Sequence, residues 1–157
     1  MSVLGFATDH PVKGLDPVAD AFSGTVYSDV VNLANYASAE FTIYKGVGAT
    51  GTSTITMEAC DNAAGANPVA VPFYYQAYTG VDDLPGVVTA AAAAGFDTTA
   101  GSSQLYEIQV DSQRLPSGKN WLRLKAVEVV NDPVLGGILI ELEGPRYATD
   151  IPATAIA

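Results

Sequence analysis

Few residues of this 157-residue chain could carry out acid–base or nucleophilic catalysis. The single histidine, His10, lies among Pro11, Gly14 and Pro17, in a stretch of the chain that has no clear hydrophobic period. A catalytic triad needs its base held rigidly within hydrogen-bonding distance of the nucleophile, and an extended arm does not provide that. We therefore expect His10 to face solvent or an interface, and we expect no catalytic residues.

Paired carboxylates offer a second possible chemistry, because glycosidases work with two of them. Glu141 and Glu143 alternate along one expected strand, and Glu107 lies on another. A glycosidase acid also needs an apolar pocket that raises its pKa. These glutamates instead occupy the polar positions of ordinary alternating strands. A solvated outer face is therefore favoured, and a hydrolase that uses Glu107 and Glu141 is the alternative.

Oxygen ligands for a cation occur in two segments, Asp61–Gly65 and Asp82-Asp83. Neither has the spacing of an EF-hand loop, so a calcium loop is an alternative rather than an expectation. Cys60 and the one histidine are too few for an ordinary zinc site, and no phosphate-binding loop is present. We expect no metal and no cofactor, and Cys60 is expected to be a small structural residue.

Short runs of alternating apolar and polar residues supply the elements that would position these groups. In Gln104–Asp111, Tyr106, Ile108 and Val110 fall on one face, which is typical of a half-buried strand. The same pattern predicts strands at Thr25–Leu33, Ser38–Lys45, Thr52–Cys60, Ala70–Tyr78, Val87–Thr89, Ser103–Asp111, Asn120–Val130 and Leu135–Glu143.

Two connections between these strands can be predicted from their residues. Gly46–Gly51 would join its flanking strands as a hairpin, because glycine allows the positive φ of tight turns. The alanine-rich run Thr89–Ala94 is too short for a stable helix, so we expect a loop or one helical turn there.

The strand pattern predicts an all-β fold. No gap has the pattern of the helix that a parallel crossover usually carries, so a two-sheet antiparallel β-sandwich is expected, with a jelly roll favoured. An immunoglobulin-like sandwich is second, since one cysteine cannot make its disulfide. We expect residues 1–24 to form an extended N-terminal arm, residues 25–144 the sandwich, and residues 145–157 a C-terminal tail.

Composition limits the partners of the chain. Charged residues make up only 15%, and acids outnumber bases 17 to 7, for a net charge of −10. This balance argues against nucleic acid and against an anionic membrane. The chain has no apolar run of membrane-spanning length, and Met1–Phe6 lacks the basic start of a signal peptide, which predicts synthesis in the cytoplasm. Weakly charged surfaces favour assembly with other proteins, and a simple soluble acidic protein is the alternative.

Two groups of side chains are candidates for partner contact. Tyr74 and Tyr78 offer both apolar area and a hydroxyl, although the edge of a sandwich core would explain them equally well. Arg123 and Lys125 share one strand face with Trp121, and they could meet an acidic partner or pair with glutamates on a neighbouring strand. Apolar residues of the terminal segments could also be buried against a partner: Val3, Leu4, Phe6 and Ile151.

Several stretches of the chain resemble a known class of proteins. They are SAEFTIYKGVGATGTSTITMEACD at 38–61, WLRLKAVE at 121–128, PVLGGIL at 133–139 and GPRY at 144–147. Together they resemble the capsid cement or decoration proteins of tailed bacteriophages, some of which are jelly rolls. The resemblance runs from Ser38 to Tyr147, and it lies in strand and loop phrases rather than in a catalytic motif.

This resemblance implies a virion structural protein that binds the outside of an assembled shell. Its partner would be the major capsid protein, and it would brace the joints between capsid subunits as a homo-oligomer, a dimer or a trimer. It would be made in the host cytoplasm, would reside on the capsid exterior and would not be an enzyme. The alternative function is a carbohydrate-binding or adhesive module, whose aromatic platform would use Trp121, Tyr74 and Tyr78.

Overall fold

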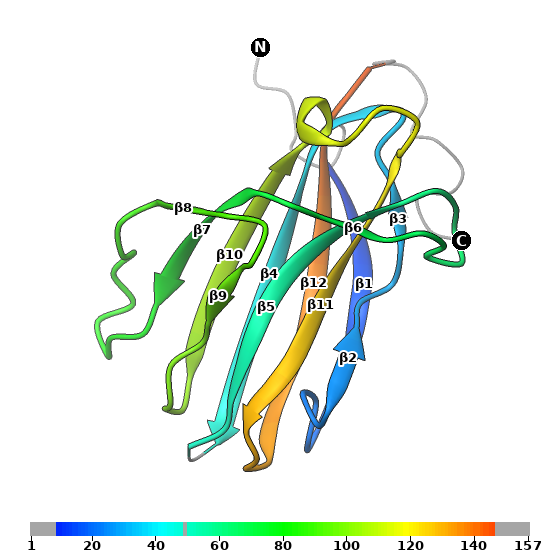
Figure 1. Cartoon of the computed structure of the whole chain (residues 1–157). Helices are drawn as coiled ribbons and strands as arrows, with labels where there is room; N and C mark the ends of the chain where they lie inside the picture. The colour runs from blue at the N-terminus through cyan, green and yellow to red at the C-terminus, as the bar shows by residue number, and fades with distance from the viewer. Residues whose placement is uncertain (1–8, 49, 147–157) are drawn as a thin grey trace.

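The computed structural model describes residues 9–48 and 50–146, which form two six-stranded antiparallel sheets packed face to face (Figure 1). The expected antiparallel β-sandwich is therefore confirmed. Within the described residues the one helix is a short 3-10 turn, η2 (Ser112–Arg114). The strands are β1 (Asp9–Val18), β2 (Thr25–Tyr27), β3 (Val31–Asn32), β4 (Tyr36–Gly48), β5 (Thr52–Cys60), β6 (Val69–Val71), β7 (Phe73–Tyr78), β8 (Thr89–Ala91), β9 (Phe96–Asp97), β10 (Gln104–Asp111), β11 (Trp121–Val130) and β12 (Val134–Pro145).

The strand pairing is that of a jelly roll. Sheet A has the order β1-β12-β4-β10-β7-β8, and sheet B has the order β2-β11-β5-β6, with β3 on β11 and β9 on β5. The first strand pairs with the last, β2 with β11, β4 with β10 and β5 with β6, and these nested pairs alternate between the sheets. This is how a long antiparallel ribbon rolls into two sheets around one core. Strands β7 and β8 extend sheet A beyond β10 at one edge (Figure 1).

The core lies between the two sheets and is built by the alternation along each strand. In β10, Tyr106, Ile108 and Val110 are buried while Gln109 and Asp111 are exposed, as the sequence predicts. Both sheets contribute fully buried side chains, among them Phe41, Ile43, Ile108 and Ile140 from sheet A and Ile55, Met57, Leu122 and Leu124 from sheet B. Each such side chain contributes roughly 1.5–3 kcal/mol when it leaves water.

A buried lysine joins the loops at one end of the sandwich. Lys45 occupies an inward position of β4 and is 2% exposed. Its Nζ donates to the carbonyl oxygens of Gly51 (3.0 Å) and Thr99 (2.7 Å) and to Oε1 of Gln104 (3.3 Å). Burial lowers the pKa of Lys45, yet each of its three donors has an acceptor, as a buried ammonium group requires. Lys45 thereby fastens two loops to β4.

The N-terminal arm is the main correction to the expected fold. Residues 9–18 are not part of an arm but form β1, which pairs with β12 from Asp9 opposite Glu143 to Val18 opposite Gly136. The prolines in this segment obscured the strand pattern. β1 is an edge strand, and one row of backbone groups on an edge strand faces away from the ladder, where proline loses no hydrogen bond.

Four other segments also differ from expectation. The segment Gly46–Gly51 is not a hairpin turn, because β4 belongs to sheet A and β5 to sheet B. The predicted strand Ala70–Tyr78 is divided at Pro72, so that β6 joins sheet B and β7 joins sheet A, and Thr25–Leu33 is divided into β2 and β3. Part of the alanine run forms β8, because pairing with β7 gives its backbone partners and buries Ala91.

The alternation along β4 can be tested with two aromatic residues of the same strand. Phe41 is fully buried between the sheets, whereas Tyr44 is 55% exposed. We expect Phe41→Ala to lower the free energy of unfolding by about 3–5 kcal/mol through the cavity that it leaves. Tyr44→Ala should change it by no more than about 1 kcal/mol. Urea denaturation of both variants checks this, and equal losses would contradict the assigned faces of β4.

Candidate interaction surfaces

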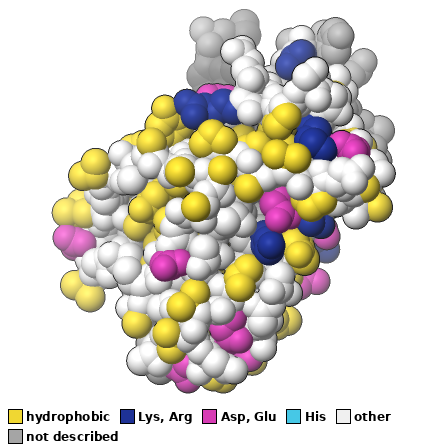
Figure 2. Space-filling model, in the orientation of Figure 1, with side chains coloured by type: hydrophobic (Ala, Val, Ile, Leu, Met, Phe, Trp, Pro, Cys, Tyr) yellow, Lys and Arg dark blue, Asp and Glu magenta, His cyan; other side chains and the backbone are white. Residues whose placement is uncertain are grey.

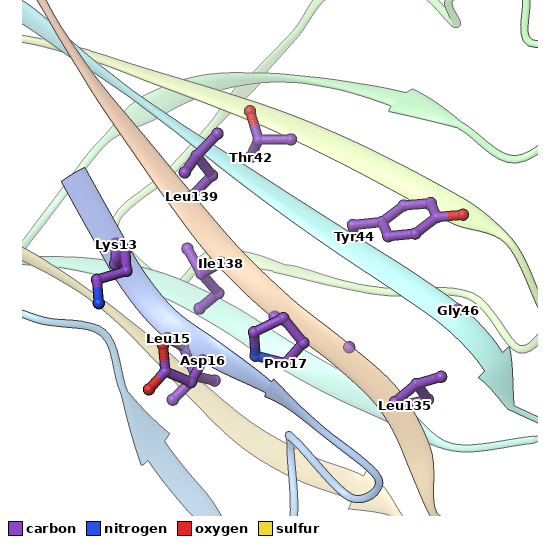
Figure 3. A pocket seen from close by; sticks show the side chains of 12 residues that line it. Lys13, Leu15, Asp16, Pro17, Thr42, Tyr44, Gly46, Leu135, Ile138 and Leu139 are labelled. Carbon is purple, nitrogen blue, oxygen red and sulfur yellow. The ribbon is translucent and has the colours of Figure 1, made fainter. Parts of the chain in front are cut away.

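The outer face of sheet A carries an open apolar hollow, here called the sheet A hollow (Figure 3). It has a volume of about 500 Å³ and lies over β1, β12 and β4. Leu135, Leu139 and Tyr44 stand around it with half of their surface exposed, and Lys13 and Asp16 are the charged residues at its rim. Exposed apolar side chains gathered around a hollow mark a surface that other molecules can cover.

Glycine residues form the floor of this hollow. Gly137 lies opposite Tyr44 in the β12–β4 ladder, and a Cβ on Gly137 would come within 3.0 Å of the Leu15 carbonyl oxygen and 3.2 Å of the Pro17 nitrogen. β1 therefore packs closely over β12 where its register with β12 shifts, between Leu15 and Val18. The absence of a side chain at Gly137 leaves the hollow open between its apolar walls.

The other half of the same outer face is acidic. Glu40 lies directly opposite Glu141 on β12, in the register that also brings Glu143 opposite Ser38. Partial burial, followed by the nearby carboxylates of Glu107, Glu143 and Glu141, raises the pKa of Glu40. Glu107 and Glu141 lie on the strands flanking β4 and are partly exposed, which agrees with the solvated face that the sequence favours. A hydrolase that uses them stays an untested prediction.

The basic pair of sheet B meets a glutamate of the neighbouring strand. Arg123 donates from Nη2 and Nε to Oε2 of Glu58, at 2.7 and 2.9 Å, and Lys125 lies 3.6 Å from Oε1 of the same carboxylate. The Arg123 guanidinium also stacks 4.0 Å from the centre of the Tyr27 ring. Of the two roles that the sequence allows, cross-strand pairing is the one present, and contact of this pair with an acidic partner stays untested.

The candidate aromatic platform is divided between two faces. Trp121 lies on the outer face of sheet B, whereas Tyr74 and Tyr78 lie on the outer face of sheet A. Tyr74 accepts a hydrogen bond from Arg114 (2.9 Å), whose guanidinium lies 4.5 Å from its ring centre, and Tyr78 donates to Glu107 (2.8 Å). These rings do not form one sugar-binding surface.

The described chain begins and ends at the same end of the sandwich. Asp9 pairs with Glu143, and the Arg146 backbone nitrogen donates to the Asn35 carbonyl oxygen at 2.8 Å. A polar hollow of about 420 Å³ lies at this end, lined by Ala37, Asp111, Ser112, Gln113 and Arg146. The terminal contact candidates Val3, Leu4, Phe6 and Ile151 lie outside the described residues.

The two most exposed large apolar side chains among the described residues belong to the segment 79–88 between β7 and β8, here called the apolar loop. Val81 is fully exposed, Val87 is 86% exposed, and Leu84 and Val88 also face solvent. The base of the loop is held by the Gly86 nitrogen, which donates to the Ala77 carbonyl oxygen at 2.9 Å. Sequence reasoning missed this surface, although four large apolar residues among Gly, Asp and Pro in a non-alternating segment could have signalled it.

The remaining candidates for catalysis or metal binding, His10, Asp61 and Cys60, each have neighbours that fit a structural role. His10 lies on β1 with its ring 6.3 Å from that of Tyr36. In the loop after β5, Asp61 accepts hydrogen bonds from Lys119 and Asn67, which lower its pKa. Cys60 is buried. Across residues 9–48 and 50–146, no cluster of three or more potential metal ligands occurs, and no helix has the length and apolarity to span a membrane.

Comparison with known proteins gives distant structural likenesses only. No protein family and no curated protein matches the chain by sequence. The SPBc2 prophage-derived protein YomS is 12% identical over 84% of this chain and 92% of its own, with a TM-score of 0.43. A structure of infectious bursal disease virus, Gx strain, covers 87% of this chain and 42% of its own (12% identity, TM-score 0.23). Desmodium yellow mottle tymovirus covers 93% and 90% (12% identity, TM-score 0.19). At these scores the likenesses carry no functional argument, and the fold assignment rests on the strand order.

The contribution of the Arg123–Glu58 ion pair to stability can be tested by removing the carboxylate. Their side chains are only 14% and 10% exposed, so removal of the carboxylate leaves a partly buried guanidinium without its partner. We expect Glu58→Gln to lower the free energy of unfolding by about 2–3 kcal/mol, which is less than the loss for a fully buried pair. Glu128→Gln is the control, since among the described residues the Glu128 carboxylate accepts a hydrogen bond from the exposed Gly24 nitrogen only. Equal urea midpoints for the two variants would rule out this role for Glu58.

The acidic half of the outer face of sheet A predicts that the stability of the fold depends on pH. The pKa of Glu40 is raised above its ordinary value of 4.5, so the folded protein holds this proton to a higher pH than the unfolded chain does. The ionised carboxylate therefore costs stability, and the cost develops as the pH rises from about 4.5 through the raised pKa. We expect Glu40→Gln to raise the Tm by a few degrees at pH 7 and to change it little near pH 3.

Glu141→Gln should reproduce part of that gain, because it removes one of the carboxylates that act on Glu40. Thermal melts across this pH range measure the effect. If the gain in Tm at low pH equalled or exceeded the gain at neutral pH, the ionised Glu40 carboxylate would not be the source of the instability.

Proposed function

We propose that this protein is a structural component of a tailed-phage virion, which binds the outer capsid surface and stabilises the joints between capsid subunits. It would work as a rigid block rather than as an enzyme. The proposal combines the sequence resemblance to cement proteins with one observation. The described chain begins at Asp9 and ends at Arg146 at the same end of the sandwich.

This arrangement lets both terminal segments meet the same partner. Residues 1–8 precede β1 and residues 147–157 come after β12 and Arg146, and these two strands are neighbours in sheet A. The segments carry the apolar contact candidates Val3, Leu4, Phe6 and Ile151. The polar hollow beside Arg146 adds hydrogen-bonding groups at the same end of the molecule.

The energetics favour a repeated partner. Each terminal residue that becomes ordered costs about 1–2 kcal/mol of backbone entropy, whereas a fully buried Leu or Phe contributes roughly 1.5–3 kcal/mol. A segment with few large apolar residues therefore binds weakly by itself. On a lattice of identical subunits, several such contacts in one assembly add avidity. A capsid surface provides this kind of lattice.

Co-sedimentation with heads of the encoding phage, assembled without this protein, tests the proposal. We expect the full chain to pellet with the heads and to raise the temperature at which they disrupt. Replacing both Leu4 and Phe6 with Asp should weaken binding at least tenfold, because charged groups cannot be buried without a partner.

Val129→Asp is the matched control, since Val129 is an exposed valine of β11, in sheet B. This variant should bind heads as the unmodified chain does. A full-length protein that remains in the supernatant at every concentration would contradict the proposed function.

A further inference from the structure

Two clusters account for most of the large apolar side chains that sheet A exposes. One is the apolar loop, with Val81, Leu84, Val87 and Val88. The other is the sheet A hollow, with Val18 close by and Tyr44, Leu135 and Leu139 around it. One cluster protrudes and the other is concave, so each has the shape that could cover the other.

The two clusters lie at opposite edges of one sheet. The loop leaves β7 at Tyr78, which lies opposite Leu105, and Leu105 lies opposite Tyr44, and Tyr44 opposite Gly137. Tyr78 therefore shares a row with the floor of the hollow, with β10 and β4 between them. The loop projects away from the hollow at the β8 edge, where Figure 2 shows hydrophobic side chains gathered (left in this view). One copy therefore does not cover its hollow with its loop.

One charge at the hollow can pair with the charges of the loop. Asp82 and Asp83 lie in the apolar loop between Val81 and Leu84. Lys13 lies at the rim of the hollow, on β1 (Figure 3), and no ion pair involves it within the part of the chain that the structure describes. Asp16 is the other charged group at this rim and would repel the aspartates, which restricts their approach to the Lys13 side.

We propose that the sheet A hollow is the binding site for the apolar loop of a second copy of this chain. Val81 and Leu84 of one copy would pack between Leu139 and Tyr44 of the next. Asp82 or Asp83 would pair with Lys13. Each copy would then present its own loop to a further copy.

Such a contact is head-to-tail, because the two copies use different surfaces. Repeated contacts of this kind close into a ring when the rotation between copies allows it, and otherwise grow into a filament. A symmetric dimer through the same face is disfavoured, since it would bring the acidic rows around Glu40 and Glu141 of two copies into one interface.

The inference deepens the proposed function by naming the contact that would join copies on a capsid, and it rests on that function for its biological setting only. It concerns the purified protein, whereas the proposed function concerns binding to heads. A monomer that binds heads would overturn this inference alone. An oligomer that fails to bind heads would overturn the proposed function alone.

Sedimentation equilibrium over a range of concentrations tests the contact. We expect the unmodified chain to form a closed oligomer, and both Leu84→Asp and Leu139→Asp to sediment as monomers. Val129→Asp places the same charge on an exposed valine of sheet B and should leave the oligomer unchanged.

Mixing the two disrupted variants distinguishes a head-to-tail contact from a symmetric one. Leu84→Asp keeps an intact hollow, and Leu139→Asp keeps an intact loop, so an equimolar mixture should form a 1:1 dimer that grows no further. A symmetric interface in which like residues face each other would place a disrupted residue in every contact, and the mixture would stay monomeric. A symmetric dimer in which each loop enters the other copy's hollow is distinguished by the mass of the unmodified chain, which would not exceed two copies.

A charge exchange tests the ion pair. Lys13→Glu should weaken association at least tenfold, and combining it with Asp82→Lys and Asp83→Lys should restore it at least in part. The inference is overturned if the unmodified chain is monomeric at every concentration. It is also overturned if Leu84→Asp leaves the oligomer intact, or if the mixed variants fail to associate.

Discussion

The structure depends on one constraint, which is that each strand must bury alternate side chains against a second sheet. A single sheet of these strands would leave Phe41, Ile108 and Ile140 in water on one face. The nested pairing of β1 with β12 and of β2 with β11 meets this requirement by rolling the chain into two sheets around one core. The same pairing brings the first and last strands together, so the location of the two ends follows from how the core is closed.

Polar groups are satisfied differently at the inner and outer surfaces. Inside, Lys45 has three oxygen acceptors and no carboxylate among the described residues, and it serves to fasten loops to β4. On the outer face of sheet B, Glu58 neutralises Arg123 and lies near Lys125. The outer face of sheet A is divided into an acidic half and an apolar hollow. The outer face of sheet A therefore offers a partner an apolar surface around this hollow.

This asymmetry is consistent with a protein that assembles with others. The inserted strands β7 and β8 lengthen sheet A and place the apolar loop at its far edge, away from the ends of the described chain. Contacts between copies and contacts with a shell would then use separate parts of the molecule. A rigid sandwich suits that division of roles, because neither contact needs the core to rearrange.

The sequence by itself determined the strands whose alternation is regular. The bounds of β5 agree with prediction, and those of β10 and β11 agree to within one residue, because side-chain alternation is a local property of a strand. Composition likewise indicated a weakly charged acidic protein. The tertiary structure alone decided which sheet each strand joins, and it showed that Asp9–Val18 is a strand despite its prolines. It also decided that Arg123 meets Glu58 and that Gly137 lies under β1. These features depend on pairing between residues far apart in the chain, which no local pattern specifies.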